Sequence, residues 1–311
     1  MKSFTKKFQI KKNSNLQLKK FDPSEHGAFK NQAEAAADME QTINRLRELQ
    51  AKLYATKTHS LLIVLQGLDA AGKDGVLAHV LSGLNPAGTK VAAFKNPSSV
   101  EAAHDFLWRV HPHAPAKGEI AIFNRSHYED VLVVRVHHLA PKKVWKGRYE
   151  AIQAFEHLLG EQNQTTVLKF FLHISQEEQL ARFKVRLDEP DREWKISNSD
   201  YSERELWDAY TEAFEEAISK TSTDEAPWFV IPANHKWFRD LAISKILVET
   251  LEKMELSNPP VGVDLKKIKK EFQQAESEEP KEKRKIIEKL VVKKEKKLAA
   301  KTSKENPPSK D

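Results

Sequence analysis

A glycine-rich loop that ends in a lysine links an apolar run to a helical pattern in the first third of the chain. The apolar run covers residues 61–65, the loop GLDAAGKD covers 67–74, and helical spacing follows over 76–84. Backbone N–H groups of such a loop, together with a helix N-terminus, bind phosphate groups. The loop positions expected to bind phosphate are Gly67, Ala70, Ala71, Gly72, Lys73 and Asp74. The alternative is a strand-to-helix turn of an ordinary α/β protein.

Two residues distinguish this loop from the usual G-x-x-x-x-G-K-[ST] motif. Asp74 stands where a Ser or Thr hydroxyl would bind magnesium, and Asp69 places a carboxylate inside the loop. That carboxylate would repel a phosphate chain unless a divalent cation lay between them, and magnesium prefers carboxylate oxygens. We therefore interpret Asp69 as a magnesium ligand, with manganese as the alternative ion. The competing interpretation makes Asp69 a turn or N-cap residue.

Length and composition restrict the class of protein. A chain of 311 residues with 40% hydrophobic residues can bury one sizeable core, which predicts one catalytic domain with tails. It contains neither a run of about 18 apolar residues nor a signal peptide, so we expect a cytoplasmic protein without a membrane segment. The absence of cysteine excludes disulfides, thiolate metal sites and thiol catalysis.

The positive charge of the chain is concentrated at its ends. The net charge is +6, and residues 266–311 alone contribute 16 Lys or Arg against 9 Asp or Glu. We therefore divide the chain into a basic N-terminal arm (1–30), a catalytic domain (31–256) and a lysine-rich tail (257–311), expected to be disordered or helical. A different class of function stays open here, namely non-specific binding of nucleic acid or another polyanion through the tail.

Strand and helix patterns alternate between residues 31 and 256. Strands are expected at 61–65, 90–94, 119–123, 167–174 and 228–231. Helices are expected at 31–54, 76–84, 100–110, 141–161, 176–187, 203–219 and 236–253. This alternation predicts an α/β fold with a parallel five-stranded sheet, helices on both faces and ligands at the carboxyl ends of the strands. A charged segment with a proline at 188–195 predicts a mobile helical lid near 182–205.

A dense polar cluster follows the third expected strand. Asn124 and Arg125 come directly after apolar residues 120–123, and Glu129 and Asp130 follow closely. Phosphoryl-transfer enzymes usually carry a metal-binding carboxylate at such a strand end, where Asn124 offers a neutral oxygen instead. Glu129 or Asp130 could add the missing charge, and Arg125 could hold a phosphoryl oxygen. A solvated strand end with local ion pairs is the alternative.

A cationic cluster lies at the base of the expected lid. Arg182 and Arg186 are four residues apart and share one helical face, so both are expected to point toward the phosphate site. Lys184 and Arg192 extend this positive charge. The alternative is a solvated charged helix whose arginines pair with neighbouring aspartates.

The loop at 66–75, the strand end at 123–130 and the helix with Arg182 and Arg186 together resemble the second family of polyphosphate kinases, the polyphosphate:nucleotide phosphotransferases. Further segments similar to the family are 107–111, 170–175 and 226–233. The resemblance extends from about residue 18 to residue 251 and leaves out the tail.

The resemblance implies a P-loop kinase fold and magnesium-dependent phosphoryl transfer between inorganic polyphosphate and nucleotides. It marks Asp69 and Asn124 as metal positions, Lys73 and Arg125 as phosphate positions, and Arg186 as a lid position. The form NRSHYED at 124–130 looks like the branch that phosphorylates both AMP and ADP. Other branches carry aspartate where Asn124 stands, which makes Glu129 a candidate metal partner.

These considerations give a provisional arrangement of the site. Asp69, Lys73, Arg125 and Arg186 are the expected catalytic residues, and magnesium on Asp69 connects the two substrates. The polyphosphate end is expected along Lys73, Lys184, Arg186 and Arg192, and the nucleotide (AMP, ADP or ATP) near Asn96, Arg109 and Glu129. The alternative enzyme is an ATP-dependent nucleoside monophosphate or small-molecule kinase. We also expect a homo-oligomer, with the apolar stripe of helix 31–54 as a self-association face.

Overall fold

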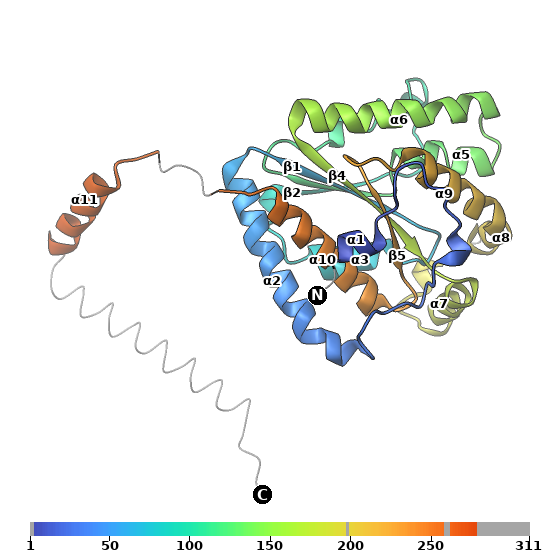
Figure 1. Cartoon of the computed structure of the whole chain (residues 1–311), viewed down its shortest axis with the longest axis horizontal. Helices are drawn as coiled ribbons and strands as arrows, with labels where there is room; N and C mark the ends of the chain where they lie inside the picture. Colours follow the sequence, from blue (N-terminus) through green and yellow to red (C-terminus); the bar gives the residue numbers. More distant parts are fainter. Residues whose placement is uncertain (1–2, 197–198, 258–261, 279–311) are drawn as a thin grey trace, which may run out of the picture. The chain divides into compact units, whose positions relative to one another are not determined.

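The structure is a computed structural model that describes residues 3–196, 199–257 and 262–278 (Figure 1). The chain divides into two units, residues 1–258 and 259–311. The larger unit contains a five-stranded sheet in the order β2-β3-β1-β4-β5, and every neighbouring pair of strands is parallel. The predicted parallel five-stranded sheet is therefore confirmed.

The five strands lie where the sequence predicts them. Their bounds are β1 Ser60–Gln66, β2 Thr89–Ala93, β3 Ile120–Asn124, β4 Thr165–His173 and β5 Trp228–Pro232. All residues of β1 and β5 are buried. β1 lies at the centre of the sheet, where helices cover both faces, whereas β5 is an edge strand that is paired with Gln9 and Ile10 of the N-terminal segment. The long apolar runs in the sequence follow from this burial.

Helices cover both faces of the sheet (Figure 1). On one face, α2 (Gln32–Thr56) and α10 (Lys236–Lys253) pack against alternate β1 residues such as Ile63. On the other face, α6 (Lys142–Asn163) and α9 (Trp207–Thr221) pack against the intervening residues such as Val64. Two apolar cores thus lie on opposite faces of one sheet, which gives the three-layer α/β arrangement expected from the sequence.

The other α-helices are shorter or lie toward the ends of the chain. They are α1 Phe4–Phe8, α3 Lys73–Val76, α4 Ser99–Ala102, α5 Val133–Val136, α7 Gln176–Asp188, α8 Ser199–Glu205 and α11 Leu265–Glu278. The 3-10 segments are Leu18–Lys20, Pro86–Gly88, His111–His113, His127–Asp130 and Glu193–Lys195, and a π-helical turn covers Leu77–Leu81.

Three predicted helices are wrong in extent. The helix expected at 100–110 ends at Ala102, because the Asp105 side chain accepts a hydrogen bond from Leu107 N and starts a turn. The helix expected at 203–219 is divided at Leu206 into α8 and α9. The helix expected at 76–84 begins at Lys73 and continues as the π-helical turn to Leu81.

The N-terminal residues pack against the sheet. Phe8, Ile10 and Leu18 are buried, and Ile10 N donates to the Trp228 carbonyl at 2.8 Å. Gln9 also forms an isolated bridge with Phe229 of β5. These first residues therefore complete the core in spite of their lysines.

The apolar stripe of α2 is covered within the same chain. Ala35, Leu46 and Leu53 are buried against residues of α10 and the sheet, and Met39 and Ile43 pack at the edge of this core. The stripe consequently does not provide the self-association face that we expected from it.

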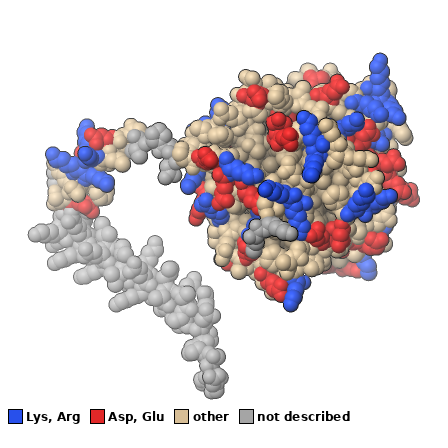
Figure 2. Space-filling model, in the orientation of Figure 1, with Lys and Arg blue, Asp and Glu red and all other residues tan. Residues whose placement is uncertain are grey.

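The second unit is described through α11. This helix carries Lys266, Lys267, Lys269 and Lys270, whereas basic and acidic side chains alternate over the visible face of the larger unit (Figure 2). Residues 258–261 and 279–311 of the predicted tail, and residues 197–198 of the predicted lid, lie outside the described residues. None of the helices that the structure describes is long and apolar enough to cross a membrane.

Candidate active site

The glycine loop connects β1 to α3 and turns sharply at three positions. Gly67, Ala70 and Gly72 have φ angles of 155°, 61° and 102°. A Cβ atom on Gly72 would lie 1.9 Å from Nη1 of Arg239, which is buried against the loop. The glycine at position 72 is therefore required both by its φ angle and by this close approach.

Lys73 bends back over the loop that precedes it. Its Nζ donates to the Gly67 carbonyl at 2.7 Å and lies 3.4 Å from the Leu68 carbonyl. Burial lowers the pKa of Lys73, while the nearby Asp69 carboxylate opposes this shift. The ammonium group of Lys73 is thus held at the opening of the loop, where a phosphate chain would be bound.

Asp69 and Arg125 meet at the carboxyl edge of the sheet. Since β1 and β3 are neighbours, the residues after them lie close together, and Arg125 Nη2 is 3.1 Å from Asp69 Oδ1. Arg125 has a φ of 60°, and its backbone N donates to the Leu65 carbonyl at 3.1 Å. A left-handed residue other than glycine is uncommon and occurs often at functional sites, here directing the guanidinium toward the loop.

The remaining polar residues after β3 belong to the same cluster. Asn124 Nδ2 donates to Asp74 Oδ1 at 2.8 Å. Burial raises the pKa of Glu129, although Arg125 and Lys73 act in the opposite direction. The structure therefore brings both candidate metal partners of Asp69 to the loop end of the sheet.

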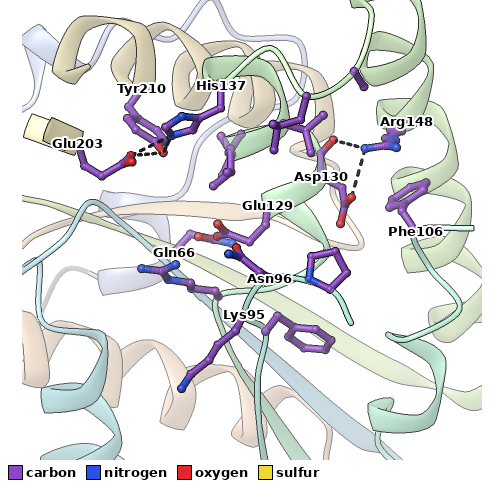
Figure 3. A pocket seen from close by; sticks show the side chains of 18 of the residues that line it. Gln66, Lys95, Asn96, Phe106, Glu129, Asp130, His137, Arg148, Glu203 and Tyr210 are labelled. Atoms are coloured by element: carbon purple, nitrogen blue, oxygen red, sulfur yellow. Dashed lines mark hydrogen bonds and ion pairs between the residues drawn. The ribbon is translucent and has the colours of Figure 1, made fainter. Parts of the chain in front are cut away.

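A cavity of about 650 Å³ opens beside this cluster (Figure 3). Its lining includes seven residues that the sequence singled out, namely Gly67, Asp69, Asn96, Arg109, Arg125, Glu129 and Asp130. The volume lies within the range of small-molecule sites in proteins. The predicted nucleotide-side residues are thus brought together at one cavity.

Two further polar groups lie in the cavity wall (Figure 3). Arg148 Nη1 donates to the carbonyl and the carboxylate of Asp130 at 2.9 and 3.2 Å. On another side, Tyr210 Oη donates to Glu203 Oε2 at 2.7 Å, and His137 Nε2 lies 3.1 Å from the same oxygen. No pattern in the sequence indicates this second group, because its members come from the residue after α5, from α8 and from α9.

The guanidinium of Arg109 mainly contacts other residues of the cavity wall. Its Nη1 donates to the Lys95 carbonyl at 2.7 Å, and its Nη2 lies 3.6 Å from Asp130 Oδ2. Only 8% of its surface is exposed. Arg109 therefore lines the cavity mainly as a support for Lys95 and Asp130.

Arg182 does not point toward the phosphate site as a lid cation, so that expectation is wrong. It is buried, and its guanidinium donates to the Ala70 carbonyl at 2.8 Å and the Ala233 carbonyl at 2.6 Å. Its Nε donates to Glu178 Oε1 at 2.8 Å. Helical spacing predicts that Arg182 and Arg186 share one face of the helix, but it does not predict that α7 packs beneath the loop. Arg182 stabilises the loop from behind.

The other lid cations lie outside the cavity lining that the structure describes. Lys184 pairs with Asp188 at 2.7 Å, Arg192 pairs with Glu189 at 2.6 Å, and Arg186 Nη1 donates to the Lys195 carbonyl at 3.3 Å. The aspartate and glutamate partners agree in part with the alternative of a solvated charged helix.

Lys236 adds a cation that sequence reasoning missed. It begins α10, and burial together with the charges of Arg182 and Arg192 lowers its pKa. Residues 192 and 236 are far apart in sequence, so their proximity depends on the fold.

A buried ionic network supports the turn that carries Glu129. Lys169 of β4 is fully buried, and its Nζ lies 2.5 Å from Glu156 Oε2 of α6. Tyr128 Oη lies 2.9 Å from both Glu156 Oε1 and Thr221 Oγ1 and can donate its proton to either oxygen. Tyr128 thus anchors the 127–130 turn through a charge pair that the sequence did not reveal.

The donor atoms at the loop fit a hard divalent cation. Within the described residues there is no group of three or more His, Cys, Asp or Glu side chains placed to hold a metal ion. Magnesium in phosphate-transfer sites, however, takes one or two carboxylates and completes its shell with water and phosphate oxygens. Asp69, on the loop itself, offers such a carboxylate.

The fold and the loop geometry define a phosphoryl-transfer protein of the P-loop type. The family described as Polyphosphate kinase 2 (PPK2) matches residues 29–259, and the chain belongs to this family. It is 49% identical over 264 residues to the AMP/ADP-polyphosphate phosphotransferase of Meiothermus ruber, a match covering 85% of this chain and 98% of that protein. The ADP-polyphosphate phosphotransferase of Rhodopseudomonas palustris is 42% identical over 272 residues, 83% of this chain and 93% of that one.

A solved structure has the same architecture. The crystal structure of polyphosphate kinase 2 from Arthrobacter aurescens TC1 superposes with a TM-score of 0.84 and 39% identity, covering 88% of this chain and 97% of that chain. The family resemblance expected from the loop and strand-end motifs is therefore confirmed.

Proposed function

We propose that this protein transfers the terminal phosphoryl group reversibly between inorganic polyphosphate and AMP or ADP, forming ADP or ATP. The observation that carries the proposal is the contact of Asp69 with Arg125 across the phosphate loop, at the mouth of a cavity of nucleotide size. Family membership and the names of the Meiothermus and Rhodopseudomonas relatives support polyphosphate as the donor.

The residues at the loop have complementary roles in this reaction. Asp69 would hold magnesium, or manganese in its place, with Asn124 and Glu129 near it; the cation would neutralise phosphate charge. Lys73 binds the phosphate chain at the loop, and Arg125 binds the transferring phosphoryl group as its charge redistributes. The attacking oxygen of the nucleotide is already anionic, so no general base is needed and positioning dominates catalysis.

The two substrates would approach the loop from different sides. The nucleotide occupies the cavity lined by Asn96, Arg109 and Glu129. The polyphosphate chain follows the cations outside that cavity, Lys184, Arg186, Arg192 and Lys236, since a polyanion needs a line of positive charges rather than an apolar pocket. The part of the segment 182–205 that follows the buried Arg182 would close over the chain as a lid.

Polyphosphate-driven synthesis of ATP tests the proposed function directly. Purified protein with magnesium, AMP and long-chain polyphosphate, but without ATP, is expected to form ADP and then ATP, because one cavity accepts both nucleotides. Chromatography of the nucleotides over time measures both steps. If no product forms while the same preparation phosphorylates AMP from ATP, the protein is an ATP-dependent nucleotide kinase instead.

Removal of the tail separates catalysis from polyanion binding. Truncation after Pro260 is expected to leave kcat for AMP within about twofold, because residues 1–258 form one unit that contains the whole cavity. Salt-dependent binding to nucleic acid, measured by fluorescence anisotropy, should fall strongly because most of the excess positive charge is removed. Loss of catalysis in the truncated protein would place an essential element in the tail.

A further inference from the structure

Two positions of the phosphate site carry unusual residues, namely the one after Lys73 and the one at the end of β3. In the common phosphate loop a hydroxyl follows the lysine and a carboxylate ends the second strand, and both serve the metal ion. Here the helix position carries the carboxylate, Asp74, and the strand end carries the neutral amide, Asn124. These two positions together still carry one carboxylate, but it lies on the helix and not at the strand end.

Asp74 and Asn124 are in direct contact. Asn124 Nδ2 donates to Asp74 Oδ1 at 2.8 Å, from the end of β3 to the first turn of α3. The contact requires one donor and one acceptor, so an aspartate at position 124 would face Asp74 with a second carboxylate. The two residues are therefore matched to each other, and either single change disturbs the pair.

Two carboxylates reach the end of β3 from different elements. Asp69 belongs to the loop and Asp74 to α3. Asp69 contacts Arg125 and Asp74 contacts Asn124, so the two carboxylates meet consecutive residues of the chain. Asp69 thus faces a guanidinium, whereas Asp74 accepts from a neutral amide.

We propose that Asp74, oriented by Asn124, is the second carboxylate ligand of the divalent cation held by Asp69, and that it supplies the charge that the strand end lacks. This inference deepens the proposed function, on which it rests, because it assigns a ligand to the cation of that reaction. Two carboxylates with water and phosphate oxygens form a normal magnesium shell.

An exchange of the two side chains tests this assignment. Asp74→Asn removes the charge but keeps an acceptor for Asn124, and Asp74→Asn/Asn124→Asp returns the charge to the strand end. Binding of Mn²⁺ alone, measured by proton relaxation enhancement, should weaken about tenfold in the single variant and return to within about threefold of the wild type in the double. Glu252→Gln, which removes an exposed carboxylate paired with Arg45, is the control and should bind Mn²⁺ as the wild type does.

The possible results separate this inference from the proposed function. Wild-type Mn²⁺ affinity in Asp74→Asn would overturn the assignment, as would a loss that the second substitution fails to restore. Asp74→Ser, which has the usual P-loop residue, provides the same test if the amide variant does not fold. Mn²⁺ binding is measured without nucleotide or polyphosphate, so it does not depend on the phosphoryl donor. Failure of the wild type to use polyphosphate would contradict the proposed function and leave the binding result unchanged.

Discussion

Asp69→Asn is expected to lower kcat for polyphosphate-driven AMP phosphorylation at least about 100-fold, with little change in stability. The substitution removes the carboxylate from the loop and the charge that orients Arg125, whose Nη2 lies 3.1 Å from Asp69 Oδ1. Loss of one charge-stabilising group at a reaction centre typically costs this much in rate. The side chains of both partners are about one-third or more exposed, and such pairs contribute only about 0–1 kcal/mol to stability. Initial rates and urea unfolding measure the two effects.

Asp38→Asn is a matched control for this variant. It also breaks an aspartate ion pair, with Lys245 at 2.6 Å, but between α2 and α10 and outside the cavity lining. Its kcat is expected to stay within about twofold of the wild type. If Asp69→Asn kept wild-type kcat, Asp69 would have no role in binding the cation, and the carboxylate would serve as a turn residue only.

The sheet could be predicted from the sequence because burial on both faces requires uninterrupted apolar runs. Buried strands such as β1 at Ser60–Gln66 stand out against polar loops, whereas the edge strand β2 is largely exposed. Parallel pairing then follows from the helices between strands. The contact between Asp69 and Arg125 follows from the same logic. Two strands that are neighbours in the sheet bring the residues after them together.

The sequence was less informative where the direction of a side chain depends on packing. Arg182 and Arg186 share a helical face by spacing, yet Arg182 lies beneath the loop and donates to its carbonyls. Likewise, apolar spacing at 100–110 imitates a helix, whereas Asp105 forms a local turn there. The period of a sequence pattern indicates which positions share a face, but it does not indicate which element packs against that face.

The buried pair of Lys169 and Glu156 could not be predicted, for a related reason. The two residues are thirteen apart, one on β4 and the other on α6, and only the packing of that helix on the sheet joins them. A single lysine within an apolar strand is nevertheless a signal. Because a buried ammonium requires a partner, such a lysine indicates a buried acid elsewhere in the chain.

Lys169→Met is expected to lower the free energy of unfolding by about 3–5 kcal/mol, the usual cost of breaking a buried ion pair on one side. The ammonium of Lys169 contacts Glu156 Oε2 at 2.5 Å and the Thr221 carbonyl at 2.8 Å, and both charged side chains are almost fully buried. Methionine fills similar space but leaves the carboxylate without its cation. Urea denaturation of the variant and the wild type measures the difference.

The double variant Lys169→Met/Glu156→Gln decides whether charge is the cause. It removes both charges and should recover more than half of the loss, since the cost comes from the isolated carboxylate. Burial alone would raise the pKa of Glu156, but Lys169 and His127 hold it below its usual value of 4.5. In the wild type, this stabilisation should therefore be present in full above pH 4.5 and be lost as the pH falls through the lower pKa of Glu156 in the folded state. The stability of the double variant should not change with pH for this reason, because it lacks the carboxylate. Equal losses in the single and double variants would instead show that Lys169 acts through the packing of its aliphatic chain.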